Sequence, residues 1–439
     1  MPLDYADPQG PTIGLSLVRK PATSSRGRLG SIVVNPGGPG GSGVDYVRGG
    51  GVVDPSVAAR YDVVGFDPRG VQRSAPVRCL TAKQTDEFLA YDGSPDNDIE
   101  ATGAYLLGRS FGAKCELKAA QELPFLGTRE TTFDMEVLRQ VLGDDALNFV
   151  GKSYGTYLGS QYASRFPDKV GRFVLDGAID PSLTAEQYAK GQAVGFQRAL
   201  DAFIRDCVAR SSCPLGRDPE RATERLNAYL DRLDSRPQQV GTRNLTQSLA
   251  VMGVIGSLYS TSTWPLLRDA LSLGIEGDGS GLLQIADSYS DRDADGSYSS
   301  NATDAFYATY CLDRPDTKGV DAMRALGLEF RAKVSRTFGE YIAWGQTPCP
   351  SWPVKATTRP AKVTAAGASP ILVVGTTRDP ATPWEWSKAL AGQLDSGVLL
   401  TREGDGHTAY REGNGCIDQA VDTYLLMGRA PKSGTVCTP

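Results

Sequence analysis

Short apolar runs that alternate with stretches of helical periodicity constrain the fold of this 439-residue chain more than any other feature. The runs are rich in valine and other strand-forming residues, and glycine, proline or aspartate follows several of them. Between them, the apolar side chains of residues 132–142 recur at the spacing of one helix face. A regular alternation of this kind predicts an α/β fold, with a mainly parallel sheet covered by helices. The strands predicted in this first part cover residues 32–34, 63–66, 147–150 and 173–175.

The pattern changes after Asp180-Pro181 and returns near the C-terminus. Between these points the periodicity is mostly helical, and a polar tract at residues 287–301 predicts an exposed loop. Strand-like runs reappear at residues 371–374 and 398–400. We therefore predict one split α/β domain with a helical insertion, and no internal repeat is evident. The predicted boundaries are residues 1–180 and 361–439 for the two parts of the domain and 181–360 for the insertion.

The sequence Gly151-Lys152-Ser153-Tyr154-Gly155 lies between the predicted strand at 147–150 and a helical stretch at 156–165. Small residues around the serine permit strained backbone angles, so that a sharp strand-to-helix turn exposes its hydroxyl. A serine hydroxyl becomes a nucleophile near neutral pH when a neighbouring base takes its proton, and imidazole is the usual base. The chain contains a single histidine, His407, so a nucleophilic Ser153 requires His407 as its base. The alternative is an ordinary glycine-flanked turn and a structural histidine.

A third residue of such a site, a carboxylate that orients the imidazole, is expected after a later strand. Asp379 lies five residues beyond Val374, and the order Ser153, Asp379, His407 is the order of this type of site in α/β-hydrolases. Asp405 is the rival carboxylate, but it lies so close to His407 in sequence that it would struggle to reach the ring edge opposite Ser153. We therefore predict Asp379 as the third catalytic residue.

The glycine-rich segment Asn35-Pro36-Gly37-Gly38-Pro39-Gly40-Gly41-Ser42-Gly43 has two interpretations. It satisfies the dinucleotide-binding pattern G-x-G-x-x-G after a strand, but no clear helix start follows it. Alternatively, its glycines let a backbone N–H group point at the negative charge that develops on a tetrahedral intermediate. Together with the predicted catalytic residues, the second interpretation predicts an oxyanion hole formed by the N–H groups of Gly38 and Tyr154. We therefore expect no cofactor.

Charge and composition exclude several classes of function. A formal net charge of −5 gives no polybasic surface for nucleic acid or anionic lipid. No apolar stretch reaches the roughly 18 to 20 residues that span a bilayer. Residues 1–5 lack the charged-then-apolar pattern of a secretion signal, so the protein either stays inside the cell or begins here as a mature form. The sequence has no Cys-x-x-Cys pair and one histidine, so we expect no structural metal.

The eight cysteines point to disulfides and an oxidising compartment, because their number is even and several lie close in sequence. Sequence alone does not determine the connectivity, and eight buried thiols in a cytoplasmic protein remain an open alternative. Our hypothesis pairs the cysteines in sequence order, as Cys79–Cys115, Cys207–Cys213, Cys311–Cys349 and Cys416–Cys437.

Taken together, five segments make the chain resemble the actinobacterial tripeptidyl aminopeptidase family, a branch of the α/β-hydrolase serine peptidases related to proline iminopeptidases. The resemblance extends from the first residues to the last cysteine. It implies an α/β-hydrolase fold with a lid, and a secreted or envelope-associated enzyme that removes short peptides from free N-termini. The family motifs map onto Ser153, Asp379, His407 and the loop around Gly38. The segments are Asn35–Gly43, Gly65–Gly70, Gly151–Thr156, Val174–Gly177 and Asp379–Pro383.

The resemblance leaves the substrate open. An aminopeptidase needs an anionic pocket for the substrate's ammonium group, for which the insertion offers Glu186, Asp201, Asp206 and Asp313 among others. An esterase or amidase that hydrolyses small ester or N-acylated metabolites would use the same three catalytic residues. A non-catalytic binding protein on a hydrolase scaffold is the alternative from another class. A monomer is the working expectation for the oligomeric state.

Overall fold

The computed structural model describes residues 1–24, 27–316 and 318–438, and within this part of the chain one eight-stranded sheet dominates. All neighbouring strands are parallel except β1 and β3 at one edge, which are antiparallel. In spatial order the strands are β1 (Leu17–Lys20), β3 (Tyr61–Phe66), β2 (Gly30–Asn35), β4 (Leu147–Lys152), β5 (Val170–Asp176), β8 (Ile371–Arg378), β9 (Gly397–Asp405) and β10 (Thr435–Cys437).

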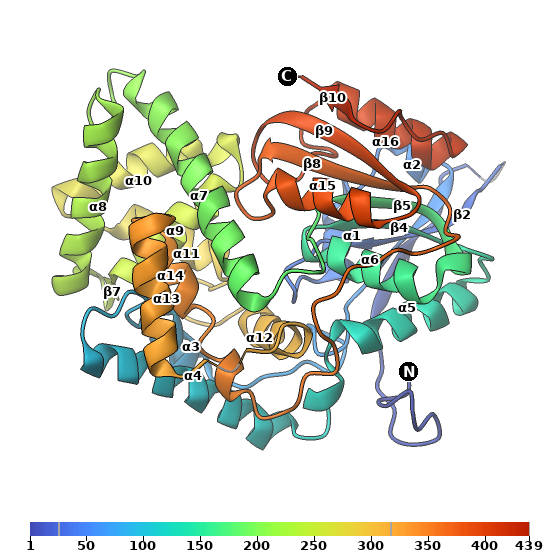
Figure 1. Cartoon of the computed structure of the whole chain (residues 1–439), viewed down its shortest axis with the longest axis horizontal. Coiled ribbons are helices and arrows are strands. Elements are labelled where there is room, and N and C mark those ends of the chain that lie inside the picture. The colour runs from blue at the N-terminus through green and yellow to red at the C-terminus, as the bar shows by residue number, and fades with distance from the viewer. Residues whose placement is uncertain (25–26, 317, 439) are drawn as a thin grey trace.

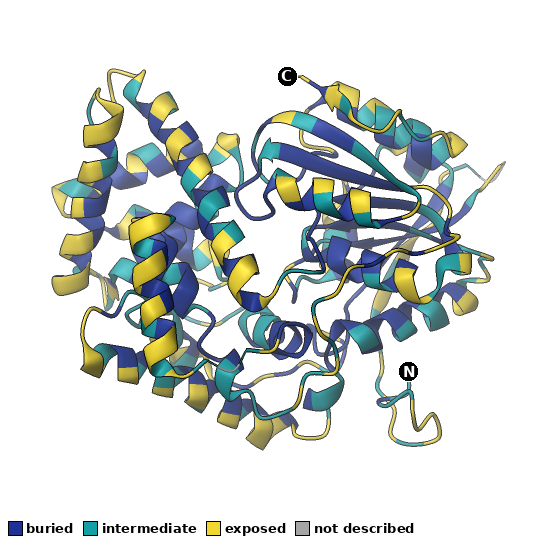
Figure 2. Ribbon diagram, in the orientation of Figure 1, coloured by how far each residue is buried: buried dark blue, intermediate teal, exposed yellow. Residues whose placement is uncertain are grey.

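The central strands are buried on both faces, which is why they appear in the sequence as continuous apolar runs. Consecutive side chains point to opposite faces: Phe149 joins one apolar core and Val150 the other. Helices cover both faces (Figures 1 and 2). The first core contains residues of α5 (Thr128–Leu142), α6 (Tyr154–Arg165) and α15 (Trp384–Gln393), and the second contains residues of α1 (Gly43–Gly49), α2 (Pro55–Ala58) and α16 (Gly415–Met427). This is the α/β-hydrolase fold, as predicted.

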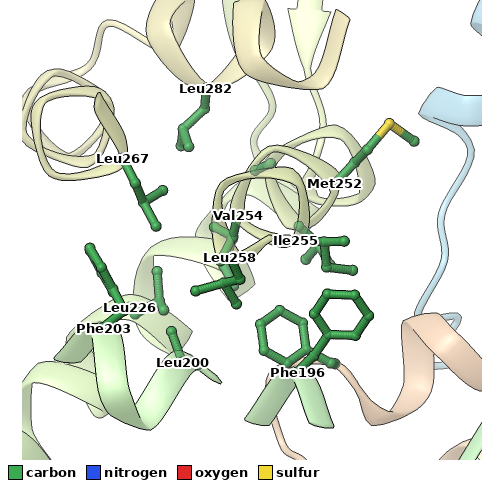
Figure 3. Close-up of a cluster of buried hydrophobic side chains, with 14 of the residues drawn as sticks. Phe196, Leu200, Phe203, Leu226, Met252, Val254, Ile255, Leu258, Leu267 and Leu282 are labelled. Carbon is green, nitrogen blue, oxygen red and sulfur yellow. The ribbon is translucent and has the colours of Figure 1, made fainter. Parts of the chain in front are cut away.

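The chain between β5 and β8 forms a mostly helical lobe beside the sheet, which we call the cap (Figure 1). It has an apolar core of its own, in which Phe196, Phe203 and Leu226 pack against Val254 and Leu282 (Figure 3). The cap elements are α7 (Ala185–Val208), α8 (Pro219–Ser235), the hairpin β6 (Gln238–Val240) and β7 (Arg243–Leu245), α9 (Gln247–Leu258), α10 (Trp264–Glu276), α11 (Ser280–Tyr289), α12 (Ala302–Asp313), α13 (Val320–Lys333) and α14 (Gly339–Trp344).

Two helices from the first part of the chain also pack against the cap. Helix α3 (Ala82–Ala90) contacts α9, and α4 (Asp98–Ala119) contacts α13 (Figure 1). Ion pairs reinforce the contact, because Arg292 of the cap binds Asp86 and Arg324 binds Asp98. The polar tract predicted as an exposed loop, residues 287–301, lies here, but its first three residues end α11. Its last residue, Asn301, is buried and donates to the carbonyl oxygens of Gly70 and Val77.

The four disulfides pair the cysteines in sequence order and confirm that hypothesis. Cys79–Cys115 links the loop before α3 to α4, and Cys207–Cys213 lies within the cap. Cys311–Cys349 joins α12 to the chain after α14, and Cys416–Cys437 fixes β10 to α16. None of the helices in the described ranges is long and apolar enough to cross a membrane.

Candidate active site

Ser153 occupies a strained turn between the end of β4 and the start of α6. Its backbone angles, φ 56° and ψ −124°, lie in a region that non-glycine residues rarely adopt, and such strain clusters at functional sites. Gly155 permits the turn to lie close to β2, because a Cβ atom there would come within 2.8 Å of the carbonyl oxygen of Asn35. The Ser153 N–H group donates to the carbonyl oxygen of Asp176, at the end of β5, over 2.9 Å.

Asp379 and His407 meet at the same edge of the sheet, just beyond the carboxyl ends of β8 and β9. The Nδ1 atom of His407 lies 2.9 Å from each carboxylate oxygen of Asp379. The carboxylate is 2% exposed and accepts further hydrogen bonds from the backbone N–H groups of Ala381, Thr382 and Thr408. These contacts fix the orientation of the carboxylate and, through it, that of the imidazole.

The rival carboxylate, Asp405, pairs with an arginine and not with His407. It binds the Arg378 guanidinium in a bidentate pair, with N–O distances of 2.7 and 2.9 Å. The structure therefore brings Asp379 to His407 and directs Asp405 elsewhere. Thr382 is a neighbour of the imidazole that the sequence did not single out, with its Oγ1 atom 3.3 Å from Nδ1 of His407.

The loop of His407 lies directly against the strand end that holds Ser153. The Asp176 carboxylate accepts hydrogen bonds from the N–H groups of Ala409 and Tyr410, over 2.9 to 3.0 Å. A Cβ atom added to Gly177 would lie 3.3 Å from Cε1 of His407, so the ring packs over this glycine. Within the described residues no hydrogen bond joins the Ser153 hydroxyl to His407. In free enzymes such bonds are often long and shorten when substrate binds.

The glycine-rich loop after β2 passes over the Ser153 turn. A Cβ atom on Gly37 would lie 2.8 Å from Cβ of Ser153 and 3.1 Å from the backbone nitrogen of Tyr154. The Gly37 N–H group donates to Oδ1 of Asn35. Both N–H groups predicted for the oxyanion hole lie at this turn: Tyr154 begins α6, and the Gly38 N–H group donates to no backbone acceptor among the residues that the structure describes.

A short helix does follow the glycine-rich loop, although the sequence showed no clear start for it. Helix α1 begins at Gly43, and its first turn is capped by Ser42, whose side chain accepts from the N–H group of Asp45. Ser42 in turn donates to Asp67 over 2.5 Å. The helix start is thus capped from within the chain, while the loop itself lies over Ser153.

Two buried charged residues, Lys152 and Asp176, lie next to Ser153. The Nζ atom of Lys152, which precedes Ser153, lies 2.9 Å from Oε1 of Glu412. Burial acts to lower the pKa of Lys152, but the charge of Asp176, with Tyr46 and Glu412, outweighs this effect and the pKa is raised. Burial raises the pKa of Asp176 although Lys152 opposes the shift. Lys152 and Asp176 therefore stabilise each other's charged form next to the Ser153 turn.

Comparison with known proteins places the chain in a family. Residues 334–437 match the family described as TAP-like protein. Serine protease Hip1 of Mycobacterium tuberculosis is 38% identical over 455 residues, an alignment that covers all of this chain and 86% of that protein. The chain belongs to the TAP-like family of α/β-hydrolases.

Two further relatives of this TAP-like chain have other names. Carboxylesterase B of M. tuberculosis is 39% identical over 453 residues and matches all of the chain and 85% of its own length. Tripeptidyl aminopeptidase of Streptomyces lividans is 31% identical over 458 residues, with coverage of 100% and 82%. The predicted family resemblance is confirmed, and the TAP-like chain is a serine hydrolase.

The cap of the TAP-like chain supplies a residue that sequence reasoning missed. The backbone N–H group of His407 donates to the carbonyl oxygen of Tyr259, just beyond α9, over 2.8 Å. The Tyr259 ring also packs edge-on against the imidazole, with 5.2 Å between ring centroids. No sequence signal identifies this contact, because it depends on how the cap docks on the core.

The four carboxylates suggested for an amine pocket are all bound to other groups. The carboxylate oxygen Oε2 of Glu186 lies 3.4 Å from Nζ of Lys318. Asp206 forms ion pairs with Arg210 and Arg268. Asp201 accepts a hydrogen bond from the Gln197 side chain over 2.8 Å. Asp313 is buried and accepts from the backbone and the hydroxyl of Thr128, whose Oγ1 atom lies 2.5 Å from the Tyr154 hydroxyl. Only Asp313 is thus linked to the site, and burial raises its pKa to about 6.

Proposed function

We propose that this chain is a serine exopeptidase that releases short peptides, of about tripeptide length, from free N-termini. Ser153 attacks the peptide carbonyl carbon, His407 takes its proton, and Asp379 holds the imidazole and stabilises its charged form. One observation carries the proposal: both carboxylate oxygens of Asp379 lie 2.9 Å from Nδ1 of the chain's single histidine, at the sheet edge that holds the strained Ser153 turn.

The reaction proceeds in two halves through an acyl-enzyme. Attack by Ser153 gives a tetrahedral intermediate, whose oxyanion accepts hydrogen bonds from the N–H groups of Gly38 and Tyr154. One such donor contributes about 3 to 4 kcal/mol to stabilisation of the transition state. His407 then protonates the leaving amine, and the peptide beyond the cleaved bond departs. Water, deprotonated by His407, hydrolyses the acyl-enzyme and regenerates Ser153.

The cap supports an exopeptidase rather than an endopeptidase. An exopeptidase needs a wall that limits how many residues extend beyond the scissile bond. We propose residues 181–360 as this lid over the core formed by residues 1–180 and 361–439, and its Tyr259 lies on the imidazole of His407. One relative is named tripeptidyl aminopeptidase, which agrees with a fixed product length. The four disulfides favour a secreted or envelope-associated location.

A second candidate function uses the same three catalytic residues. A relative that matches the whole chain at 39% identity is named carboxylesterase B, which favours hydrolysis of esters or amides of small acyl groups. Such an enzyme would need no recognition of a free amine.

Matched peptides with free and blocked N-termini separate the two functions. We expect tripeptidyl 4-nitroanilides to be cleaved, their N-acetylated forms to be cleaved at least 100-fold more slowly, and Ser153→Ala to abolish both reactions. Equal turnover of free and acetylated substrates would instead establish the esterase or amidase. Full activity of Ser153→Ala would contradict both functions.

A further inference from the structure

A row of aromatic side chains extends from the catalytic imidazole into the cap. The centroid of the Tyr259 ring lies 5.2 Å from that of the His407 ring and 5.6 Å from that of the Tyr289 ring. The hydroxyl groups of Tyr259 and Tyr289 are 3.1 Å apart. Tyr259 follows α9 and Tyr289 ends α11, so both belong to the cap.

The Tyr289 side chain is accessible and yet surrounded by protein. Its exposure is 45%, the largest among the residues of this row, but burial still raises the pKa of its hydroxyl. The ring therefore lies at the surface of the cap, in contact with the Tyr259 ring. Tyr341 and Tyr307 behave in the same way, being half-buried with pKa values raised by burial.

We infer that Tyr259 and Tyr289 form the wall that binds apolar and aromatic side chains in the N-terminal part of the substrate. The inference rests on the proposed function and adds a substrate class to it. In an exopeptidase the cap holds the part of fixed length, while the leaving peptide, which has no fixed length, extends to solvent. Residues of the cap beside His407 therefore contact the part that becomes the acyl group.

The dimensions of the row agree with a short peptide. Three extended residues span about 10 Å, which is enough to extend from His407 to both rings, since successive ring centroids are 5.2 and 5.6 Å apart. Tyr259 would contact the residue next to the cleaved bond, and Tyr289 the residue nearer the free N-terminus. Aromatic rings pack favourably on aliphatic and aromatic side chains, beyond the effect of buried area. Glycine or an acidic residue at the N-terminus would gain no such contact.

The test compares two substrates on each enzyme. Phe-Ala-Ala-4-nitroanilide and Gly-Ala-Ala-4-nitroanilide differ only in the N-terminal side chain, and the quantity measured is the ratio of their kcat/KM values. We expect the wild type to prefer phenylalanine by tenfold or more, and Tyr289→Ala to reduce this preference about tenfold through KM. Tyr289→Phe keeps the ring and should keep the ratio. Loss of fold or of the catalytic residues would lower both rates together and leave the ratio unchanged.

Leu273→Ala is the matched control, because Leu273 of α10 is 44% exposed and belongs to no part of this row. Its ratio should equal that of the wild type. An unchanged ratio in Tyr289→Ala would overturn the inference, and so would a change confined to substrates that vary beyond the cleaved bond.

Failure of the proposed function gives a different result. If the wild type cleaves no free-amine peptide but hydrolyses 4-nitrophenyl esters, the ratio of octanoate to acetate hydrolysis replaces the peptide ratio. Tyr289→Ala should then lower that ratio, because the long acyl chain lies along the same rings. An unchanged ester ratio would overturn the inference independently.

Discussion

At the scale of single residues, Asp176 connects the Ser153 turn to the loop that carries His407. Its carbonyl oxygen accepts the N–H group of Ser153, and its carboxylate accepts the N–H groups of Ala409 and Tyr410. One fully buried residue is therefore hydrogen-bonded to both elements that carry the proposed catalytic residues. We propose a positioning role for it, because its hydrogen bonds join backbone groups of both elements.

Replacement of Asp176 by asparagine should impair the rate more than substrate binding. The amide retains one acceptor oxygen but directs its NH2 group at a backbone N–H, and it leaves Lys152 without its buried counter-charge. We expect kcat to fall 10- to 100-fold with KM within about twofold, and the free energy of unfolding to fall by about 1–3 kcal/mol. Asp180→Asn is the control, since this buried carboxylate lies four residues on and binds Ser182 and Gln393. If Asp180→Asn lowers kcat equally, Asp176 has no special role.

Asp313 makes the stability of the protein depend on pH. Burial raises its pKa in the folded state to about 6, above the ordinary value of 3.8. The folded protein therefore holds this proton more tightly than the unfolded chain, and stability decreases as pH rises from about 4 to about 6. The decrease amounts to about 3 kcal/mol over that window. Asp313→Asn, which resembles the protonated form, should gain stability relative to the wild type by a similar amount between pH 4 and pH 7.

Urea unfolding at pH 4, 5, 6 and 7 measures this difference. Asp206→Asn should show the opposite sign, because hydrogen bonds from Arg210, with the charges of Arg210 and Arg268, lower the pKa of Asp206. There the wild type has its advantage at neutral pH and loses it as pH falls. A stability difference between Asp313→Asn and wild type that stays constant over the four pH values would contradict the assignment.

Candidate site residues with a local sequence signal could be predicted, whereas contacts between distant segments could not. Ser153 was evident from its glycine neighbours, and His407 because the chain has no other imidazole. The prediction of Asp379 needed only the position of the preceding strand, and in the structure its carboxylate lies 2.9 Å from Nδ1 of His407. Tyr259 gave no such signal, because its contact with His407 joins segments far apart in the chain. Asp176 lies in the family segment Val174–Gly177, but its contacts with the loop of His407 could not be predicted from the sequence.

At the scale of elements, the strands were predictable because each is buried on both faces and therefore continuously apolar. Helix α1 was not, since it is short and follows a run of glycines. The packing of α3 and α4 against the cap was also not predictable. The amphipathic pattern of α3 shows that one face is buried, but not against which partner, and α4 has no marked apolar face in its sequence.

The close packing of α9 on α11 depends on Gly253. A Cβ atom there would lie 2.7 Å from the backbone carbonyl oxygen of Leu282, which cannot move without shifting α11. Gly253→Val should therefore lower the free energy of unfolding by about 2–3 kcal/mol, the usual cost of overpacking a core. Gly392→Ala on α15 meets no atom within 4 Å and should be neutral or stabilising by up to about 1 kcal/mol. Thermal and urea unfolding measure both variants, and equal effects would show that helix propensity, not packing, decides.

At the scale of the whole molecule, the cap has an apolar core of its own, while its residues Tyr188, Tyr310 and Cys311 also join a core of the sheet. The cap core is built almost entirely from cap residues, with Ala381 as a contribution from the loop after Asp379. The carbonyl of Tyr259 holds the backbone of His407 across this boundary. The position of His407 therefore depends on how the cap packs against the core. Disulfides near the boundary between the two should affect both stability and activity.

The disulfides should stabilise the molecule unequally, in the order of the loops that they close. Cys311–Cys349 spans 38 residues and Cys207–Cys213 spans 6. Restriction of the unfolded chain contributes about 4 kcal/mol for the longer loop and about 2 kcal/mol for the shorter one. Paired replacement by alanine should lower the free energy of unfolding by these amounts in urea without reductant. Cys311 belongs to α12, whose first residue, Ala302, packs closely against Gly40 of the glycine-rich loop. The Cys311→Ala/Cys349→Ala variant should therefore also lose activity at temperatures where Cys207→Ala/Cys213→Ala retains it. Equal destabilisation of the two variants would show that strain or contacts at the sulfur atoms, rather than loop length, set the contribution of each link.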